Sequence, residues 1–117
     1  SANKEVGDPM PKMKFDKTMI DFGKVKKGEK KTGVYHFTNV GTAPLTIDLV
    51  SGCECTTSDH TRGAVAPGET GKITIYFDST EKEESEVVDV DVILENIDPV
   101  TETSIFEILQ FKFELVE

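Results

Sequence analysis

From Lys12 onwards, apolar and polar side chains alternate in short segments that are separated by Gly, Pro and Asn. A period of two places successive side chains on opposite faces of an extended strand, whereas a helical face repeats every 3.6 residues. In the clearest example, Val88, Val90, Val92 and Leu94 share one face, and the opposite face is largely acidic. The alternation therefore predicts an all-β chain.

The same alternation predicts where the other strands lie. We expect an opening strand over residues 13–22 that is interrupted and resumes, and strands near residues 31–40, from residue 45, and near 73–77, 88–94 and 109–115. Turn signals fall at residues 26–29 and 67–69. The other side chains expected to face the core are Tyr35, Phe37, Leu45, Ile47, Leu49, Ile73, Ile75, Phe77, Leu109, Phe111, Phe113 and Leu115.

Six or seven strands of this kind suit a two-sheet sandwich, in which the inner faces fill a gap of about 10 Å. We predict an immunoglobulin-like β-sandwich of about seven antiparallel-type strands over residues 12–117, preceded by a flexible N-terminal segment at residues 1–11. A small barrel is the main alternative. The likeness is architectural, because the chain has no Trp and no widely separated cysteine pair.

Composition excludes two classes of partner. The net charge of −9 argues against binding to a phosphate backbone, which requires Lys and Arg to neutralise a polyanion. No run of about 18 apolar residues is present to cross a bilayer. We therefore predict neither nucleic acid as a partner nor a membrane span.

The charge is unevenly distributed along the sequence. Eight of the thirteen basic residues are lysines within residues 12–31, and nine carboxylates fall within residues 81–102. One interpretation is that these are solvated loop tips and strand edges, where charge discourages edge-to-edge pairing. The other is an electrostatically steered contact with a partner or with a neighbouring copy.

The chain's only two cysteines, Cys53 and Cys55, are one residue apart. Counting by twos from Leu45 places both on the inward face, unless Gly52 introduces a bulge. They could be small buried hydrophobes, since free Cys is among the most buried residue types. They could instead be bonded to each other, and such a short loop would add only about 1.6 kcal/mol of stability.

Metal binding and catalysis are the remaining interpretations of the pair. Cu(I) could accept the two thiolates alone, whereas zinc needs further ligands. The side chains that could supply them are His36, Glu54, Asp59 and His60. The candidates for a copper or redox site are therefore Cys53, Cys55 and His60. A thiol enzyme could use Cys55 with Asp59 and His60, but nearness in sequence does not establish the geometry that catalysis requires. We therefore predict no catalytic residue, no cofactor-binding residue and no cofactor.

Five short motifs in a fixed order resemble domain-of-unknown-function family 1573 over roughly two thirds of the chain. The motifs are Asp21-Phe22-Gly23-Lys24-Val25, Phe37-Thr38-Asn39-Val40-Gly41, Pro44-Leu45-Thr46-Ile47, Cys53-Glu54-Cys55-Thr56, and Pro67-Gly68-Glu69-Thr70-Gly71 before the strand at residues 73–77. The resemblance implies a sandwich and an exported, often lipid-anchored bacterial protein, and it brings no activity. Glu54 occupies a position where the family usually has Gly, and the match fades beyond Asn96.

These observations lead to a functional expectation. We expect a non-catalytic exported binding or scaffolding module, located outside the cytoplasm, that contacts protein or cell-surface glycan through strand edges and end loops. Residues 1–11 lack the apolar core of a signal peptide, so we expect a mature form, with a possible lipid anchor upstream. The alternatives are a thiol-based metal or redox site at Cys53 and Cys55, and a structural domain that packs against copies of itself.

Overall fold

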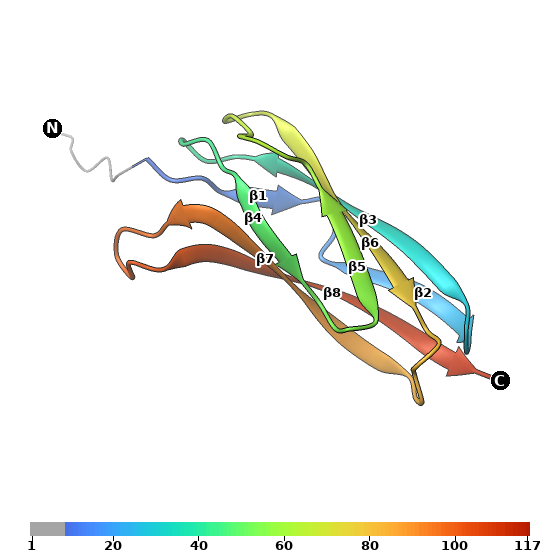
Figure 1. Cartoon of the computed structure of the whole chain (residues 1–117). Helices are drawn as coiled ribbons and strands as arrows, with labels where there is room; N and C mark the ends of the chain where they lie inside the picture. The colour runs from blue at the N-terminus through green and yellow to red at the C-terminus, as the bar shows by residue number, and fades with distance from the viewer. Residues whose placement is uncertain (1–8) are drawn as a thin grey trace, which may run out of the picture.

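The computed structural model describes residues 9–117, which form eight β-strands and no helix. The strands build two four-stranded sheets that form the two layers of a sandwich (Figure 1). The first sheet contains, in spatial order, β1 (Met13–Phe15), β3 (Lys30–Asn39), β6 (Thr70–Asp78) and β5 (Thr56–His60). The second sheet contains β2 (Met19–Lys26), β8 (Ser104–Val116), β7 (Glu86–Ile97) and β4 (Ile47–Ser51). The predicted all-β sandwich is confirmed, with eight strands where about seven were expected.

The strand predicted over residues 13–22 is divided between the two sheets. β1 pairs antiparallel with β3, and after a short corner the chain continues as β2, which pairs parallel with β8. The sandwich thus contains one parallel pair, which the prediction of antiparallel-type strands did not include. The register of β2 shifts between Asp21 and Lys24, where Gly23 adopts a left-handed φ of 69° that suits glycine.

The N-terminal segment predicted at residues 1–11 falls partly outside the described residues, which begin at residue 9. Met10 accepts a hydrogen bond of 2.7 Å from the backbone N–H of Thr42, and its own N–H donates to the Thr42 hydroxyl. Pro11 is buried. In the described part of the chain no helix is long and apolar enough to cross a membrane.

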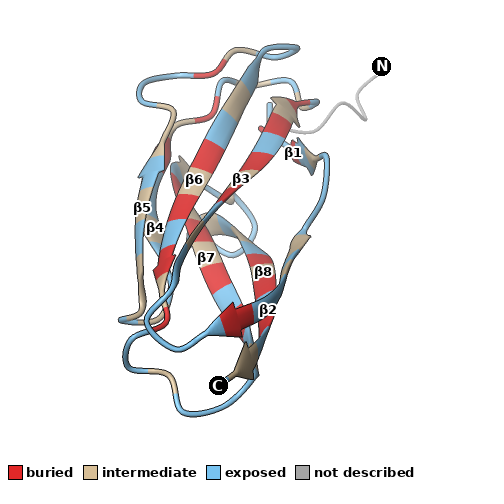
Figure 2. Cartoon of the chain, turned by 90° about the vertical axis from the view of Figure 1, so that its right-hand side faces the viewer, coloured by how far each residue is buried: buried red, intermediate tan, exposed pale blue. Residues whose placement is uncertain are grey.

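The core lies between the sheets, where buried and exposed residues alternate along the strands (Figure 2). The residues predicted to face inward on β3, β6 and β7 are all buried, as are Leu109, Phe111 and Phe113 on β8. Phe77 of the first sheet packs against Phe111 and Phe113 of the second, with ring centroids 5.1 and 4.7 Å away. The alternation therefore predicted most of the hydrophobic core correctly.

Tyr35 adds a polar link between the two sheets. Its ring is fully buried, and its hydroxyl donates a hydrogen bond of 2.5 Å to the backbone carbonyl of Gln110 on β8. Burial raises the pKa of Tyr35 well above its ordinary value, because the phenolate would lose its hydration. The side chain therefore stays neutral and acts as a donor that fixes β3 over β8.

Asn39 joins three loops at one end of the sandwich. The side chain is fully buried. Its Nδ2 donates to the carbonyls of Ala43 (2.8 Å) and Val65 (3.0 Å), and its Oδ1 accepts from the backbone N–H groups of Lys12 (3.2 Å) and Gly41 (3.0 Å). Both amide protons and the carbonyl oxygen are therefore satisfied, which a buried amide requires.

The expected inward row of Leu45, Ile47 and Leu49 is wrong at its last member. The pairing of β4 with β7 shifts register between Ile47 and Leu49, so an extra residue enters the strand at this point. Leu45 and Ile47 are buried as predicted, but Leu49 points outward and is 52% exposed. The bulge lies at Asp48 and not at Gly52, and it changes the face of every residue that follows in β4.

The last two strands are longer than predicted and form a hairpin at the left end of the view in Figure 1. β7 continues to Ile97 and β8 begins at Ser104, so that the connecting turn covers only residues 98–103. The turn is closed by hydrogen bonds from Asp98 N–H to the Thr103 carbonyl and from Glu102 N–H to the Asp98 carbonyl. Five residues that were not expected to be in a strand, residues 104–108, therefore extend β8.

Candidate functional site

The cysteine pair lies in the turn that carries the chain from β4, at the edge of the second sheet, to β5, at the edge of the first. Cys53 and Cys55 form a disulfide, with Cα atoms 5.1 Å apart. Both side chains are half-buried and pack against the hydrophobic core. Of the open interpretations, the structure therefore supports the mutual disulfide, and the idea of two free, fully buried thiols is wrong.

Hydrogen bonds hold the backbone of the cysteine turn on both sides of the disulfide. The backbone N–H and the hydroxyl of Thr56 each donate to the Cys53 carbonyl at 3.0 Å. The Cys55 carbonyl accepts a bond of 2.9 Å from the N–H of Asp78 on the neighbouring chain segment. Because these bonds define the turn independently of the sulfur atoms, the disulfide adds to a conformation that the backbone already favours.

Two clefts, of about 300 and 440 Å³, lie on either side of the cysteine turn. The first is lined by acidic side chains and by Lys82, and the second by Lys30, Lys31 and Tyr76 among others. Asp78 lies in both, and its carboxylate accepts hydrogen bonds from the hydroxyl and the backbone N–H of Thr80, which lower its pKa. This carboxylate is therefore ionised and already partnered, which does not suit it for proton transfer.

His60, the third candidate ligand, is not near the cysteines. It lies at the far end of β5, and at a rise of about 3.3 Å per residue it is roughly 13 Å from Thr56. Its Nδ1 contacts the Thr61 carbonyl at 2.9 Å, and Asp59 forms an ion pair with Arg62 at 3.4 Å. The set of Cys55, Asp59 and His60 is thus not assembled, and within residues 9–117 no three His, Cys, Asp or Glu side chains gather to hold a metal ion.

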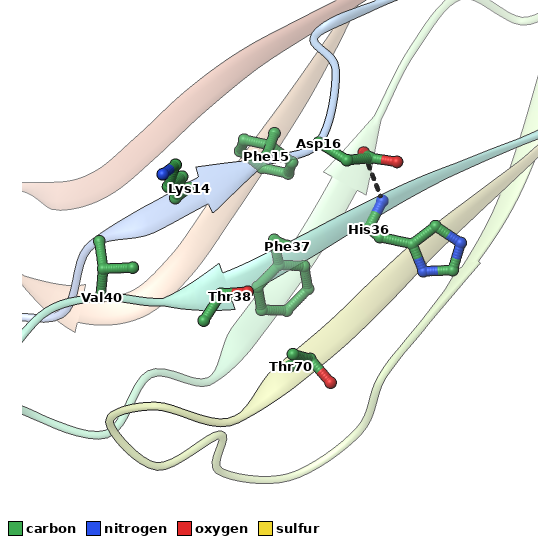
Figure 3. A pocket seen from close by; sticks show the side chains of 8 residues that line it. All are labelled: Lys14, Phe15, Asp16, His36, Phe37, Thr38, Val40 and Thr70. Carbon is green, nitrogen blue, oxygen red and sulfur yellow. Dashed lines mark hydrogen bonds between the residues drawn. The ribbon is translucent and has the colours of Figure 1, made fainter.

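A further depression of about 460 Å³ lies on the outer face of the first sheet, over β1 and β3 (Figure 3). The acidic residue that lines this depression is Asp16. Its carboxylate accepts hydrogen bonds from the backbone N–H groups of Lys17 (2.8 Å) and His36 (3.0 Å). Desolvation by burial pulls its pKa upward, but these hydrogen bonds together lower the pKa below its ordinary value. The carboxylate binds the backbone of His36 and not its imidazole (Figure 3), so the two side chains do not form an acid–base pair.

The most distinctive surface lies on the outer face of the second sheet. Leu49, Ile93 and Phe106 are cross-strand partners on β4, β7 and β8, and Ile108 lies two residues farther along β8. Leu49, Phe106 and Ile108 are 52%, 59% and 50% exposed, and Ile93 is half-buried. We call these four residues the apolar face. Asp48, Asp91 and Glu95 lie at its margins.

The outer face of the first sheet is different in character. The side chains exposed or half-exposed there are mainly hydroxyl-bearing or charged, and they include Thr32, His36, Thr57, Lys72, Thr74 and Tyr76. Contiguous exposed apolar residues on a folded protein mark contact surfaces, whereas single ones are ordinary. Of the two outer faces, the second sheet's is therefore the candidate contact surface.

Sequence reasoning missed this surface for two reasons. Leu49 was expected inward, because the bulge at Asp48 changes the parity of β4. Phe106 and Ile108 lie before the predicted start of the last strand. A signal was present, since residues 105–109 carry apolar side chains at both odd and even positions and so cannot all face one core.

Comparison with known proteins places the chain in a family. It belongs to the family described as a protein of unknown function (DUF1573), which it matches over residues 13–107. No curated protein matches it. The resemblance read from the five motifs is thus confirmed.

Solved structures show the same fold. A protein of unknown function from Porphyromonas gingivalis W83 is 24% identical, with a TM-score of 0.71, and the match covers 90% of this chain and 47% of that one. The ASH/PapD-like domain 7 of human CEP192 is 14% identical, with a TM-score of 0.64, over 100% of this chain and 96% of that domain. The VesB protease of Vibrio cholerae is 15% identical, with a TM-score of 0.67, over 87% of this chain and 31% of the protease. These similarities confirm the immunoglobulin-like architecture, and the chain spans about half of the Porphyromonas protein.

Proposed function

We propose that this chain is a non-catalytic, exported module that binds another protein chain through the apolar face. The observation that supports this is the in-register row of Leu49, Ile93 and Phe106 across three strands, extended by Ile108. Keeping three of these side chains about half exposed is unfavourable unless another surface covers them. A protein partner would remove that area from water.

The chemistry of the apolar face favours protein over glycan as the ligand. Leu and Ile side chains offer no hydrogen bonds, whereas a sugar needs donors and acceptors for its hydroxyl groups. The centre of a protein interface is typically apolar with an aromatic anchor, and its rim is polar. Phe106 supplies the aromatic side chain of the apolar face, Ile93 lies at the middle of its row, and carboxylates lie at its margins.

A location outside the cytoplasm is also part of the proposal. Disulfides persist in oxidising compartments and are rare where thiols are kept reduced. Both cysteines of this chain are joined in a disulfide. The family resemblance implies export as well. Fractionation of cells that make the full-length gene product tests this, and finding the protein only in the cytoplasm with reduced thiols contradicts it.

Site-specific photocrosslinking tests the binding function directly. A photoreactive amino acid is placed at position 106 in the apolar face or at position 76 on the other sheet, where Tyr76 is 46% exposed. We expect a defined protein adduct from position 106 and none from position 76. Equal adducts at both positions, or none at position 106, would overturn the proposal.

A further inference from the structure

Half of β8 is an open strand edge. β7 pairs with β8 along most of its length, but β2 pairs with it only from Gln110 to Val116. Within residues 9–117, no strand lies beside residues 104–109 on the side away from β7. An unpaired edge presents backbone donors and acceptors that can pair with another strand.

The direction of the backbone groups on this open edge follows from the pairing of Gln110. Its N–H donates to the Thr18 carbonyl at 2.7 Å, so the backbone groups of Gln110 face the β2 side. Successive residues of a strand direct their N–H and C=O groups to opposite sides. Those of Ile108 and Phe106 therefore face the same open side as Gln110 and lie beyond the end of β2.

We propose that this edge of β8 pairs antiparallel with the same edge of a second copy, about a two-fold axis at Phe106. The two second sheets would join into one continuous sheet, and the row of Leu49, Ile93 and Phe106 would continue into its counterpart. This inference goes beyond the proposed function, because pairing along the strand edge makes the two Phe106 side chains neighbours and leaves the outer surface of the apolar face open to a further protein. A two-fold contact requires a surface that is complementary to itself.

The sequence of the edge meets that requirement. In the register centred on Phe106, Glu107 of one copy lies opposite Ile105 of the other, and Phe106 lies opposite Phe106. Aromatic pairs across strands are favourable, whereas like charges directly opposite are not. A register centred one residue later would place the two Glu107 carboxylates opposite each other, so the register centred on Phe106 is favoured over that one.

Charge complementarity supports the same arrangement. Antiparallel pairing brings the turn at residues 98–103 of one copy towards the corner that precedes β2 in the other. The turn carries Asp98 and Glu102, and the corner carries the exposed Lys17 beside Asp16, whose carboxylate already accepts hydrogen bonds from the backbone N–H groups of Lys17 and His36. The two-fold axis repeats this contact, so opposite charges meet at both ends of the paired edge.

A proline substitution tests the pairing. Ile108→Pro removes an N–H that faces the open side and leaves the bonds to β7 in place, because proline is tolerated at a strand edge. By symmetry it removes two bonds between the copies, and we expect the dimer dissociation constant to rise by about thirtyfold. Sedimentation equilibrium over a wide concentration range measures this, and Val87→Lys, at an exposed position of β7 outside the proposed contact, is the control.

A charge exchange tests the register. Lys17→Glu or Glu102→Lys alone should weaken the dimer, and the double variant should restore it, because the exchanged pair is again complementary. A dimer that Ile108→Pro leaves unchanged, single variants without effect, or a protein that is monomeric at every concentration would overturn the inference. A monomer that still gives a defined adduct with a different protein from position 106 leaves the proposed function standing.

Discussion

At the scale of single residues, buried hydrogen bonds and close packing explain two positions of the family motif at residues 37–41, and no reaction is needed to explain them. Asn39 in the motif at residues 37–41 satisfies four backbone groups from three segments of the chain. In the same motif, a Cβ at Gly41 would lie only 2.5 Å from the backbone nitrogen of Lys12, so only glycine allows the N-terminal segment to approach. These two positions are therefore fixed by packing and not by a ligand.

Asn39→Ala should lower the free energy of unfolding by about 2–4 kcal/mol, because buried backbone groups lose their partners where water cannot replace them. Urea denaturation measures the change. Asn96→Ala is the matched control, since Asn96 also bonds two backbone groups, on Thr46 and Pro44, but is only half-buried. Equal losses in the two variants would contradict the role that we assign to burial at Asn39.

The disulfide should contribute little to stability, because it closes a very short loop. Replacing Cys53 and Cys55 together by Ser should lower the free energy of unfolding by about 1–2 kcal/mol, and the wild-type protein in reductant should behave similarly. Denaturation with and without reductant checks this. A variant that no longer folds would show that the cysteine turn depends on the disulfide.

At the scale of elements, the corner between β1 and β2 decides which sheet each part of the first strand joins. Asp16 fixes this corner to β3 through His36, whose carbonyl accepts from the Asp16 N–H at 2.9 Å and whose N–H donates to its carboxylate. Two further features belong to this scale. The bulge at Asp48 in β4 turns Leu49 outward, and the end of β2 leaves one edge of β8 open. Together they determine which side chains the second sheet presents to water.

The contribution of Asp16 should depend on pH. Because its folded pKa is below its unfolded value, the stabilisation is complete above the ordinary Asp pKa and is lost as the pH falls through the lowered folded pKa. Asp16→Ala should thus lower stability at neutral pH by about 0.5–1 kcal/mol, a small effect because the carboxylate is exposed to water. Urea denaturation as a function of pH should show the difference from wild type shrinking below about pH 4. A difference that is constant with pH would contradict this.

At the scale of the whole molecule, the two outer faces of the sandwich differ, because the second sheet carries the apolar face among charged residues, whereas the first sheet presents mainly hydroxyl-bearing or charged side chains. Within β8, the inner side of the strand carries side chains that hold the fold together, and the outer side carries side chains that are available for contact. Phe111 is fully buried, whereas Phe106 is 59% exposed. The same residue type on the same strand therefore has two roles.

Phe111→Ala should lower the free energy of unfolding by about 3–5 kcal/mol, because it opens a cavity between the sheets. Phe106→Ala should change it by less than about 0.5 kcal/mol, provided that unfolding is measured at a concentration at which the protein is monomeric. Chemical denaturation of the two variants checks both values. A large loss from Phe106→Ala in the monomer would show that this ring supports the fold and is not reserved for a partner.

The sequence by itself determined the fold class, most of the core and the family, because side-chain period and turn residues are local properties that the printed chain displays directly. Tyr35, Phe77 and Val90 were placed correctly for this reason. Only the tertiary structure decided that Leu49 faces water, that His60 lies far from Cys55 and that β8 has an open edge. These depend on which distant strand each backbone group pairs with, and a single extra residue in one strand reverses the side-chain directions that follow it.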